Sequence, residues 1–427
     1  MKKDNSPARG TRDLLPDQVH VRDHVLGAIT EVYRRFGYQR IETPALEDIA
    51  RLQGGQGGEN EKLIYQVQRR GLPLVLEAAT PLSDLVDLGL RFDLTVPLTR
   101  YYAHNQASLR LPFRSLQVGP VWRAEKPQRG RYRQFIQCDI DIVGEASVLA
   151  EAELIEATTA ALRAVGLAGT CVRVSDRRIL AAVAESAELP SGTWPAFFIG
   201  LDKLDKIGWE GVRKEFADKG LPAQNAARAL GLIEELQGAT ENKIADLLAG
   251  VLPALAPDVV ADLDTTSKCL SQLGMQYGSG WIFDPTLVRG MGYYTGQIFE
   301  VSHPDMAGSL AGGGRYDKLI GISAGRDVPA CGFSIGFERI VDLLLRTPQP
   351  DQVAVLADSD VPTQAVLALA ARLRADGRDV VVVPRTGKLG VQLSRLHEWH
   401  FASTIAVHWR DGEVAVDAER PLKAPPQ

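Results

Sequence analysis

The segment from 110 to 143 places the tightest constraint on how this chain can fold. It reads as an antiparallel hairpin, with LPFRSLQVGPVWR as one strand, EKPQRGRY as the loop and RQFIQCDIDIV as the return strand. Side chains alternate along a strand, so the return strand has two unlike faces. One face carries Ile136, Cys138, Ile140 and Ile142, and the other carries Phe135, Gln137, Asp139 and Asp141. The hairpin therefore predicts an apolar core on one side and a polar, acidic surface on the other.

The hairpin is strongly positive around its turn, from residue 123 to 133. Its only acid is Glu125, and its basic residues are Arg123, Lys126, Arg129, Arg131 and Arg133. One guanidinium group can bind two phosphate oxygens at once, and it keeps its charge at any relevant pH. With Phe135 as an aromatic platform and the nearby carboxylates, the cluster would hold a nucleotide beside an amine-bearing substrate. A solvated surface hairpin is the alternative interpretation.

Three glycine-containing segments follow later in the chain. VRGMGYYTGQIFE, from Val288, places Arg289, Tyr293 and Tyr294 between glycines that allow a ligand to approach closely. AGGGRYDKLIG, from Ala311, predicts either an anion-binding nest or a flexible loop. CGFSIGFERI runs into a helix predicted from about 336 to 345 and carries Arg339 in its first turn. The alternative interpretations are that the two tyrosines pack in the core and that Arg339 lies at the surface, and the sequence leaves both open. The chain has no GxxxxGK[ST] motif, which excludes a P-loop.

The remaining periodicities suggest how the chain is divided. A helix is expected from Pro16 to about Phe36, followed by a strand in YQRIETP and a mobile, Gly-rich loop at 51–60. Residues 147–275 are rich in Ala, Leu and Glu and predict a mostly helical region. From Val353 the pattern strand, helix, strand, helix, strand predicts a small α/β domain. Domain boundaries are therefore expected near 145, 280 and 350.

Composition and charge narrow the class of protein and the compartment that we expect. With 45% hydrophobic and 24% charged residues, the chain is typical of a soluble globular protein. No run of about 18 apolar residues occurs, so we expect a cytoplasmic protein without a membrane segment. The four cysteines form no CxxC pair, which indicates core thiols and disfavours a metal site built only from side chains. The net charge of -5 means that any RNA contact must come from local basic patches.

Taken in order, these segments resemble class II aminoacyl-tRNA synthetases, and within them the histidyl-tRNA synthetase family. YQRIETPALE resembles motif 1, WRAEKPQRGRYRQFIQCDIDIVG motif 2 and GFSIGFER motif 3, while RGMGYYTG and AGGGRYD resemble two histidine-specific signatures. RFDLTVPLTRYYA and LDKLDKIGW are also similar to family segments, so the resemblance spans roughly residues 8 to 405.

The resemblance implies a role for each matching position. Histidine would be bound by Asp93, Thr95, Arg123, Gln137, Asp141, Tyr293 and Tyr294, with Asp93, Thr95 and Gln137 at its amino group and Asp141 and Tyr294 at its imidazole. ATP would be bound by Arg123, Glu125, Arg131, Phe135 and Arg339. Arg289 and Arg123 would be the catalytic cations.

The same resemblance implies an architecture and partners. It implies an α+β catalytic domain with a mainly antiparallel sheet at 1–145 and 280–347, a helical insertion at 146–279, and a shortened anticodon-binding-like α/β domain at 351–427. ATP, Mg²⁺, histidine and tRNA would be the ligands, and motif 1 implies a homodimer. Two departures are Gly292, where the family usually has aspartate, and the short C-terminal domain.

Two rival functions stay open. One is a non-catalytic paralogue such as the regulatory subunit of ATP phosphoribosyltransferase, which resembles the same catalytic core. Such subunits typically lack the C-terminal domain and phosphate-binding arginines, whereas this chain retains Arg123, Arg131, Arg289 and Arg339. The other is a ligase that adenylates histidine but charges an acceptor other than tRNA.

Overall fold

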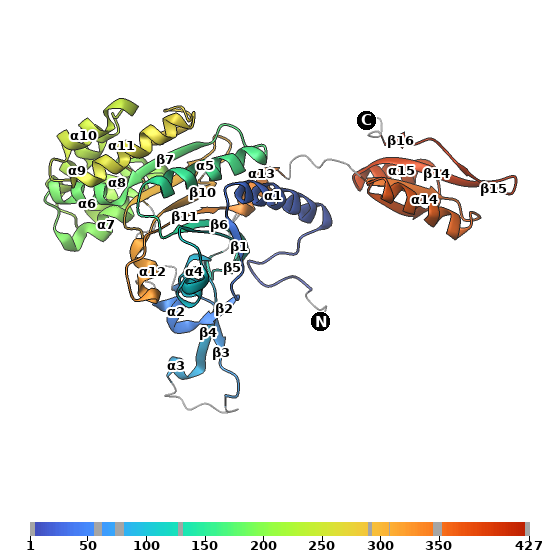
Figure 1. The fold of residues 1–427 in the computed structure, drawn as a ribbon, viewed down its shortest axis with the longest axis horizontal. Coiled ribbons are helices and arrows are strands. Elements are labelled where there is room, and N and C mark those ends of the chain that lie inside the picture. The colour runs from blue at the N-terminus through green and yellow to red at the C-terminus, as the bar shows by residue number, and fades with distance from the viewer. Residues whose placement is uncertain are drawn as a thin grey trace. The chain divides into compact units, whose positions relative to one another are not determined.

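The protein divides into two compact units, Met1–Leu343 and Leu344–Gln427 (Figure 1). The computed structural model describes residues 5–54, 62–72, 81–126, 131–288, 293–306, 308–344 and 352–422.

An eight-stranded sheet forms the centre of the first unit. In spatial order its strands are β1 (Gln39–Ile41), β5 (Phe113–Trp122), β6 (Gln134–Val143), β11 (Ala330–Ile335), β10 (Ala311–Arg315), β9 (Gln297–Ser302), β7 (Cys171–Asp176) and β8 (Trp281–Phe283). All neighbours are antiparallel except β1 with β5 and β7 with β8. The expected hairpin is confirmed, with β5 and β6 paired from Phe113↔Val143 to Trp122↔Gln134. The predicted α+β class with a mainly antiparallel sheet is therefore confirmed.

Helices flank this sheet. The helix α1 (Pro16–Arg35) packs on α5 (Leu149–Ala164), and α4 (Thr95–Asn105) packs on α12 (Asp317–Ala324) (Figure 1). The helix α1 begins as predicted, with proline in its first turn and the Gln18 side chain accepting a 3.0 Å hydrogen bond from the Leu15 N–H. It ends before Gly37, whose positive φ of 82° suits a residue without a side chain. Two short elements complete this part, η2 (Gln106–Ser108) and α13 (Phe337–Leu344).

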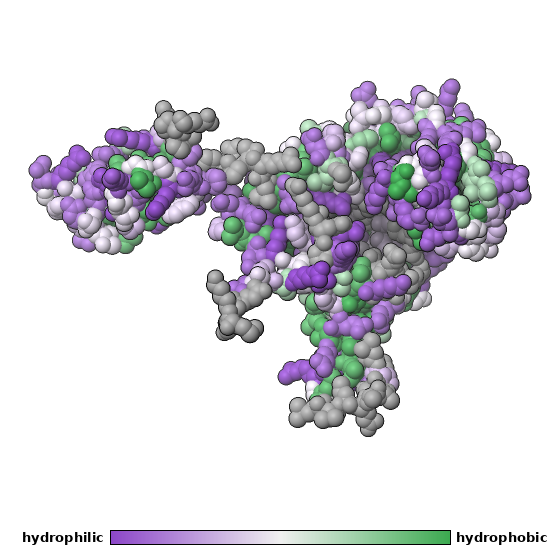
Figure 2. Space-filling model, turned by 180° about the vertical axis from the view of Figure 1, so that it is seen from behind, coloured by the Kyte–Doolittle hydropathy of each residue, from purple (hydrophilic) through white to green (hydrophobic). Residues whose placement is uncertain are grey.

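A three-stranded sheet extends from the main sheet as a separate lobe. Its order is β2 (Leu46–Asp48), β4 (Val86–Leu90) and β3 (Gln66–Gln68), joined by α2 (Ile49–Gln53) and α3 (Leu82–Leu85). The predicted loop at 51–60 was wrong at its start, because Asp48 caps α2 by accepting a 2.8 Å hydrogen bond from the Ala50 N–H. Residues 55–60 of that prediction lie outside the described residues. Hydrophobic side chains gather on the surface of this lobe (Figure 2).

The expected helical region, 146–279, contains helices and also one strand of the main sheet. Its helices are α6 (Arg177–Ser186), α7 (Trp194–Leu201), α8 (Leu204–Asp218), α9 (Ala223–Leu236), α10 (Ile244–Val251) and α11 (Pro257–Gln272), with η3 (Ser191–Thr193) and η4 (Glu241–Lys243). They cluster beside β7 (Figure 1). However, β7 itself falls within 146–279 and belongs to the central sheet, because Val172 and Val174 pair with β9 and are buried.

The second unit is a small α/β fold. Its elements are β12 (Gln352–Ala357), α14 (Thr363–Ala375), β13 (Val380–Pro384), α15 (Leu389–Glu398), β14 (Phe401–Arg410), β15 (Glu413–Val416) and β16 (Arg420–Pro421). The strand β12 is parallel to both β13 and β14, as the alternating pattern predicts. Val355, Ala370 and Val407 are fully buried in its core.

Two further sequence expectations can be compared with the fold. Cys138 and Cys331 are buried, Cys171 and Cys269 are half-buried, and all four are free thiols. Among the residues that the structure describes, none of the helices is both long enough and apolar enough to cross a membrane.

Candidate functional site

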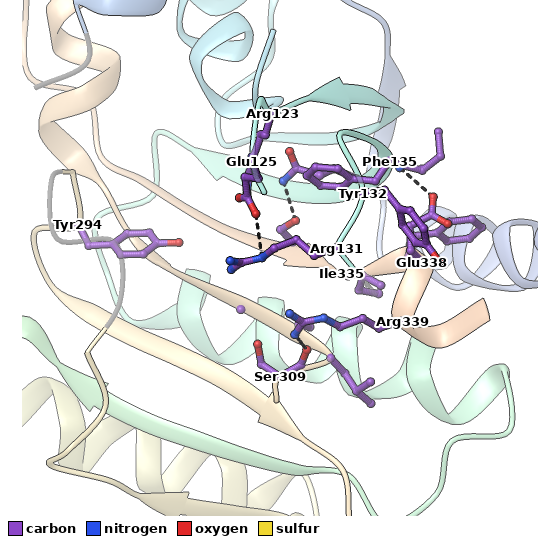
Figure 3. Close-up of a pocket in the computed structure, with 18 of the residues that line it drawn as sticks. Arg123, Glu125, Arg131, Tyr132, Phe135, Tyr294, Ser309, Ile335, Glu338 and Arg339 are labelled. Atoms are coloured by element: carbon purple, nitrogen blue, oxygen red, sulfur yellow. Dashed lines mark hydrogen bonds and ion pairs between the residues drawn. The ribbon is translucent and has the colours of Figure 1, made fainter. Parts of the chain in front are cut away.

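Two adjoining cavities lie over β6, β10 and β11. The larger has a volume of about 360 Å³ and the smaller about 60 Å³. Both are lined by Arg123, Gln137, Tyr293, Tyr294, Gly312 and Ser334. Because they share these walls, they form one site with two chambers, and Figure 3 shows side chains lining the larger one.

The larger chamber is lined by every residue that the sequence assigned to ATP: Arg123, Glu125, Arg131, Phe135 and Arg339. The guanidinium carbon of Arg123 lies 5.1 Å from the centroid of the Phe135 ring, within the range of a cation–π contact. Arg131 pairs with Glu125 at 2.8 Å, and Arg339 donates to the carbonyl oxygen of Ser309. Arg123 directly follows β5, Arg131 lies in the connection to β6 and Arg339 lies on α13, so the fold joins charges that are far apart in sequence (Figure 3).

Arg123 is anchored at the junction of the chambers. Its Nε donates a 2.8 Å hydrogen bond to the carbonyl oxygen of Phe92, in the turn between β4 and α4. This turn also carries Asp93, whose Oδ1 accepts a 3.0 Å hydrogen bond from the Val96 N–H at the start of α4. The bond from Arg123 therefore links the phosphate-binding candidates to the acidic chamber.

The smaller chamber is lined by every residue that the sequence assigned to histidine: Asp93, Thr95, Arg123, Gln137, Asp141, Tyr293 and Tyr294. Sequence reasoning assigned no role there to Asp139, Tyr316 or Ser334, which also line it. The sequence did contain a signal for Asp139, because alternation along β6 places it on the same face as Gln137 and Asp141.

Three buried carboxyl groups give this chamber its electrostatic character. Burial raises the pKa of all three groups. It raises the pKa of Asp139 well above its usual range and the pKa of Asp141 to about 7. Asp141 adds to the shift of Asp139, whereas the hydroxyl of Tyr316, 2.5 Å from Oδ1 of Asp141, stabilises the charged form of that carboxylate. The Oε1 of Gln137 is also buried and has no hydrogen-bond partner within the described chain. The chamber thus favours a ligand that brings positive charge and hydrogen-bond donors.

The expectation of a nest or flexible loop in AGGGRYD was wrong. Ala311–Arg315 form the buried strand β10, Tyr316 follows it and Asp317 begins α12. A Cβ at Gly313 would lie 2.1 Å from the carbonyl oxygen of Gly332, and one at Gly314 would lie 2.7 Å from that of Gln297. The glycines therefore allow close packing inside the sheet.

A buried ion-pair network behind the larger chamber was missed from sequence. Glu338 on α13 accepts hydrogen bonds from Arg12 at 2.6 Å, from Arg22 at 2.5 Å and from the Ile136 N–H at 3.1 Å. Arg12 also donates a 2.9 Å hydrogen bond to the hydroxyl of Tyr132, which lines the chamber. No local pattern signals such a contact, since Arg12 and Glu338 are 326 residues apart.

One assigned residue could not be compared. Arg289, with Gly292 of the same signature, lies outside the described residues.

The carboxylates available to a metal are few. Within the described residues, no group of three His, Cys, Asp or Glu side chains is arranged to hold a metal ion. Of the described residues that line the larger chamber, two are acids: Glu338 is engaged by two arginines and Glu125 by Arg131. Nucleotide phosphates and water would supply most of the ligands of a Mg²⁺ ion bound here, and Glu125 could supply a protein oxygen.

Comparisons with known proteins agree on one family. The family model described as histidyl-tRNA synthetase matches residues 10–340. A histidine–tRNA ligase of Leifsonia xyli is 47% identical over 425 residues, covering 96% of this chain and 97% of the relative. The crystal structure of histidyl-tRNA synthetase from a Nostoc species superimposes with a TM-score of 0.78 at 26% identity, covering 98% of this chain and 97% of the other. A Bacillus halodurans structure, described as an ATP phosphoribosyltransferase regulatory subunit/histidyl-tRNA synthetase, shares the fold, with a TM-score of 0.74, 23% identity, and coverage of 94% and 98%.

Proposed function

This chain belongs to the histidyl-tRNA synthetase family, and from that premise we propose that it is a histidine–tRNA ligase. It activates histidine with ATP, forming histidyl-adenylate and pyrophosphate, and then transfers histidine to the 3′ end of its tRNA. The observation that carries the proposal is the two-chambered site, in which an acidic chamber and a cationic chamber share Arg123.

The acidic chamber suits the substrate amino acid. Asp93, Thr95 and Gln137 would receive the ammonium group, and Asp141 and Tyr294 the imidazole nitrogens. A site that hydrogen-bonds both ends of a substrate rejects analogues that lack those groups, because its own buried polar atoms are then left unpaired. The unpartnered Oε1 of Gln137 is one such atom.

The cationic chamber suits the nucleotide. Phe135 and Arg339 would enclose the adenine, Glu125 would approach its edge, and Arg131 and Arg339 would bind the outer phosphates. Since Arg131 pairs with Glu125 here, nucleotide binding would exchange that ion pair for contacts with phosphate. When bound, Mg²⁺ neutralises charge on the leaving pyrophosphate.

The reaction needs no side-chain nucleophile. A carboxylate oxygen of histidine attacks the α-phosphorus, the bond from that phosphorus to the bridging oxygen breaks, and pyrophosphate takes the electron pair. Arg123 would touch both the substrate carboxylate and the α-phosphate, because it lines both chambers and is anchored to Phe92. A fixed guanidinium at that point stabilises the developing charge and aligns the reactants.

Arg289 is proposed as the second catalytic cation on the strength of its signature alone. The test is histidine-dependent exchange of pyrophosphate into ATP by the purified chain and by Arg289→Ala. We expect exchange in the parent and a loss of at least about a hundredfold in the variant, as for removal of one preorganised charge. Absence of exchange in the parent would favour the regulatory paralogue. Full exchange in Arg289→Ala would remove this residue from its role.

The acceptor and the assembly are tested separately. We propose that the second unit contacts tRNA, that the protein acts in the cytoplasm, and that it forms a homodimer. The dimer is supported by the resemblance of YQRIETPALE to motif 1. Charging of tRNA with labelled histidine distinguishes this ligase from one with another acceptor, and pyrophosphate exchange without charging would favour the other acceptor. Sedimentation tests the dimer, and a monomer in solution would exclude it.

A further inference from the structure

The amide of Gln137 is held by two side chains from neighbouring strands. Asp139 on β6 and Ser334 on β11 lie directly opposite each other in the antiparallel register. Ser334 Oγ lies 2.5 Å from Oδ1 of Asp139, and Nε2 of Gln137 lies 3.1 Å from Ser334 Oγ and 3.4 Å from Oδ2 of Asp139. Directly paired cross-strand residues on one face are close enough for such contacts.

The protons in this group permit one orientation of the amide. Ser334 has a single hydroxyl proton, which it donates to Asp139, so its oxygen can only accept from Gln137. Oδ2 of Asp139 likewise accepts from Nε2 of Gln137 in this arrangement. Turning the amide over would place Oε1 against these two acceptors, at the cost of both hydrogen bonds and of repulsion between oxygens.

The orientation has a consequence inside the smaller chamber. With Nε2 engaged by the pair, Oε1 is the atom of Gln137 that is left buried without a partner among the described residues. Gln137, Asp139 and Ser334 all line that chamber. An ammonium group is a donor without an acceptor, so it can bind Oε1 but not a turned-over NH₂ group.

We infer that Asp139 and Ser334 are positioning residues that hold the oxygen of Gln137 toward the substrate and so select for a ligand bearing an ammonium group. The inference rests on the proposed function, because it takes Gln137 as a ligand of the histidine amino group. Burial and the nearby Asp141 raise the pKa of Asp139, and the arriving ammonium opposes that shift by favouring the ionised form.

The substitution Asp139→Asn tests the mechanism with almost no change in shape. The asparagine NH₂ group can donate, so it can stabilise the turned-over amide of Gln137. Histidine would then meet a donor where it needs an acceptor. Ser334→Ala is the second variant, because it removes the hydroxyl that accepts the hydrogen bond from Nε2 of Gln137.

The experiment compares two ligands by calorimetric titration of the full chain: histidine, and 3-(imidazol-4-yl)propionate, which lacks the amino group. For both variants we expect the Kd for histidine to rise about tenfold or more, equivalent to about 1.4 kcal/mol, and the Kd for the analogue to change by less than about threefold. Melting curves confirm that each variant is folded. Asp176→Asn, a buried aspartate change on β7 outside both chambers, is the matched control and should change neither Kd.

The outcomes separate the inference from the proposed function. Equal losses for histidine and the analogue would show general damage to the chamber and overturn the inference, as would unchanged histidine binding in Asp139→Asn. If the parent chain bound neither ligand, the proposed function itself would fail.

Discussion

The hydroxyl of Tyr316 donates a 2.5 Å hydrogen bond to Oδ1 of Asp141, joining residues 175 positions apart. The bond passes over β11 at Gly332, which is paired with Asp141 in the sheet. A Cβ at Gly332 would lie 2.1 Å from that same carboxylate oxygen and 3.1 Å from the Tyr316 ring. The phenol can therefore reach the carboxylate because residue 332 has no side chain.

Gly332→Ala is expected to weaken histidine binding by at least about tenfold, since the new methyl group must displace Asp141 or Tyr316. Titration with histidine measures the effect. Gly231→Ala on α9 is the matched control, because its Cβ would meet nothing within 4 Å, and alanine there should leave binding unchanged. Normal histidine affinity in Gly332→Ala would contradict this account of the Asp141–Tyr316 contact.

The contribution of Asp141 to stability should fall as pH rises toward neutrality. Burial raises the folded-state pKa of Asp141 from 3.8 to about 7, so between these values the folded protein holds a proton that the unfolded chain has released. The free energy of unfolding then decreases with pH in this window and levels off above it, by on the order of 2 to 4 kcal/mol. Urea unfolding from pH 4 to 8 measures this. Asp141→Asn should show a shallower decrease, and curves of equal slope would refute the burial argument.

The two chambers predict different kinetic effects for two arginines. Arg123 lines both chambers, so Arg123→Ala should impair binding of histidine and of ATP. Arg339 lines only the larger one, so Arg339→Ala should raise the KM for ATP about tenfold or more and leave histidine affinity within about threefold. Steady-state exchange and histidine titration without ATP give both quantities. A comparable loss of histidine affinity in Arg339→Ala would argue against separate chambers.

Glu338→Gln should destabilise the first unit. The Glu338 side chain is 9% exposed and that of Arg22 12%, so removal of the carboxylate leaves a nearly buried guanidinium without its counter-charge. Loss of one partner from such a pair costs about 3 kcal/mol, measurable by chemical denaturation. Glu31→Gln is the control, because its pair with Arg34 is well exposed and screened by solvent, so its loss should have a much smaller effect. A similar small effect in both variants would show that the Glu338 network contributes little.

Local sequence patterns predicted the parts of this site that lie on one strand. Phe135, Gln137 and Asp141 share a face because side chains alternate along β6, and the order of residues in that segment is enough to show this periodicity. The roles of Asp93 and Arg339 in the site came from resemblance, since no spacing in the sequence shows that these residues meet. The described chambers bring all of these residues together.

The failures have an equally specific origin. Three consecutive glycines weaken a strand in isolation and so predict a loop where β10 forms, although close packing between β9 and β11 favours residues without side chains. Likewise, β7 is a short strand flanked by long helical segments, and its place in the sheet depends on pairing with β9, far along the chain. Contacts of this range, like that of Arg12 with Glu338, are properties of the fold and have no local signature.

The central claim is that the acidic and cationic chambers are the two halves of one adenylation site. The most direct test is a crystal structure with a non-hydrolysable analogue of histidyl-adenylate. The account predicts imidazole between Asp141 and Tyr294, adenine against Phe135, and the linkage between them beside Arg123. An analogue bound elsewhere, or with its imidazole in the larger chamber, would contradict it.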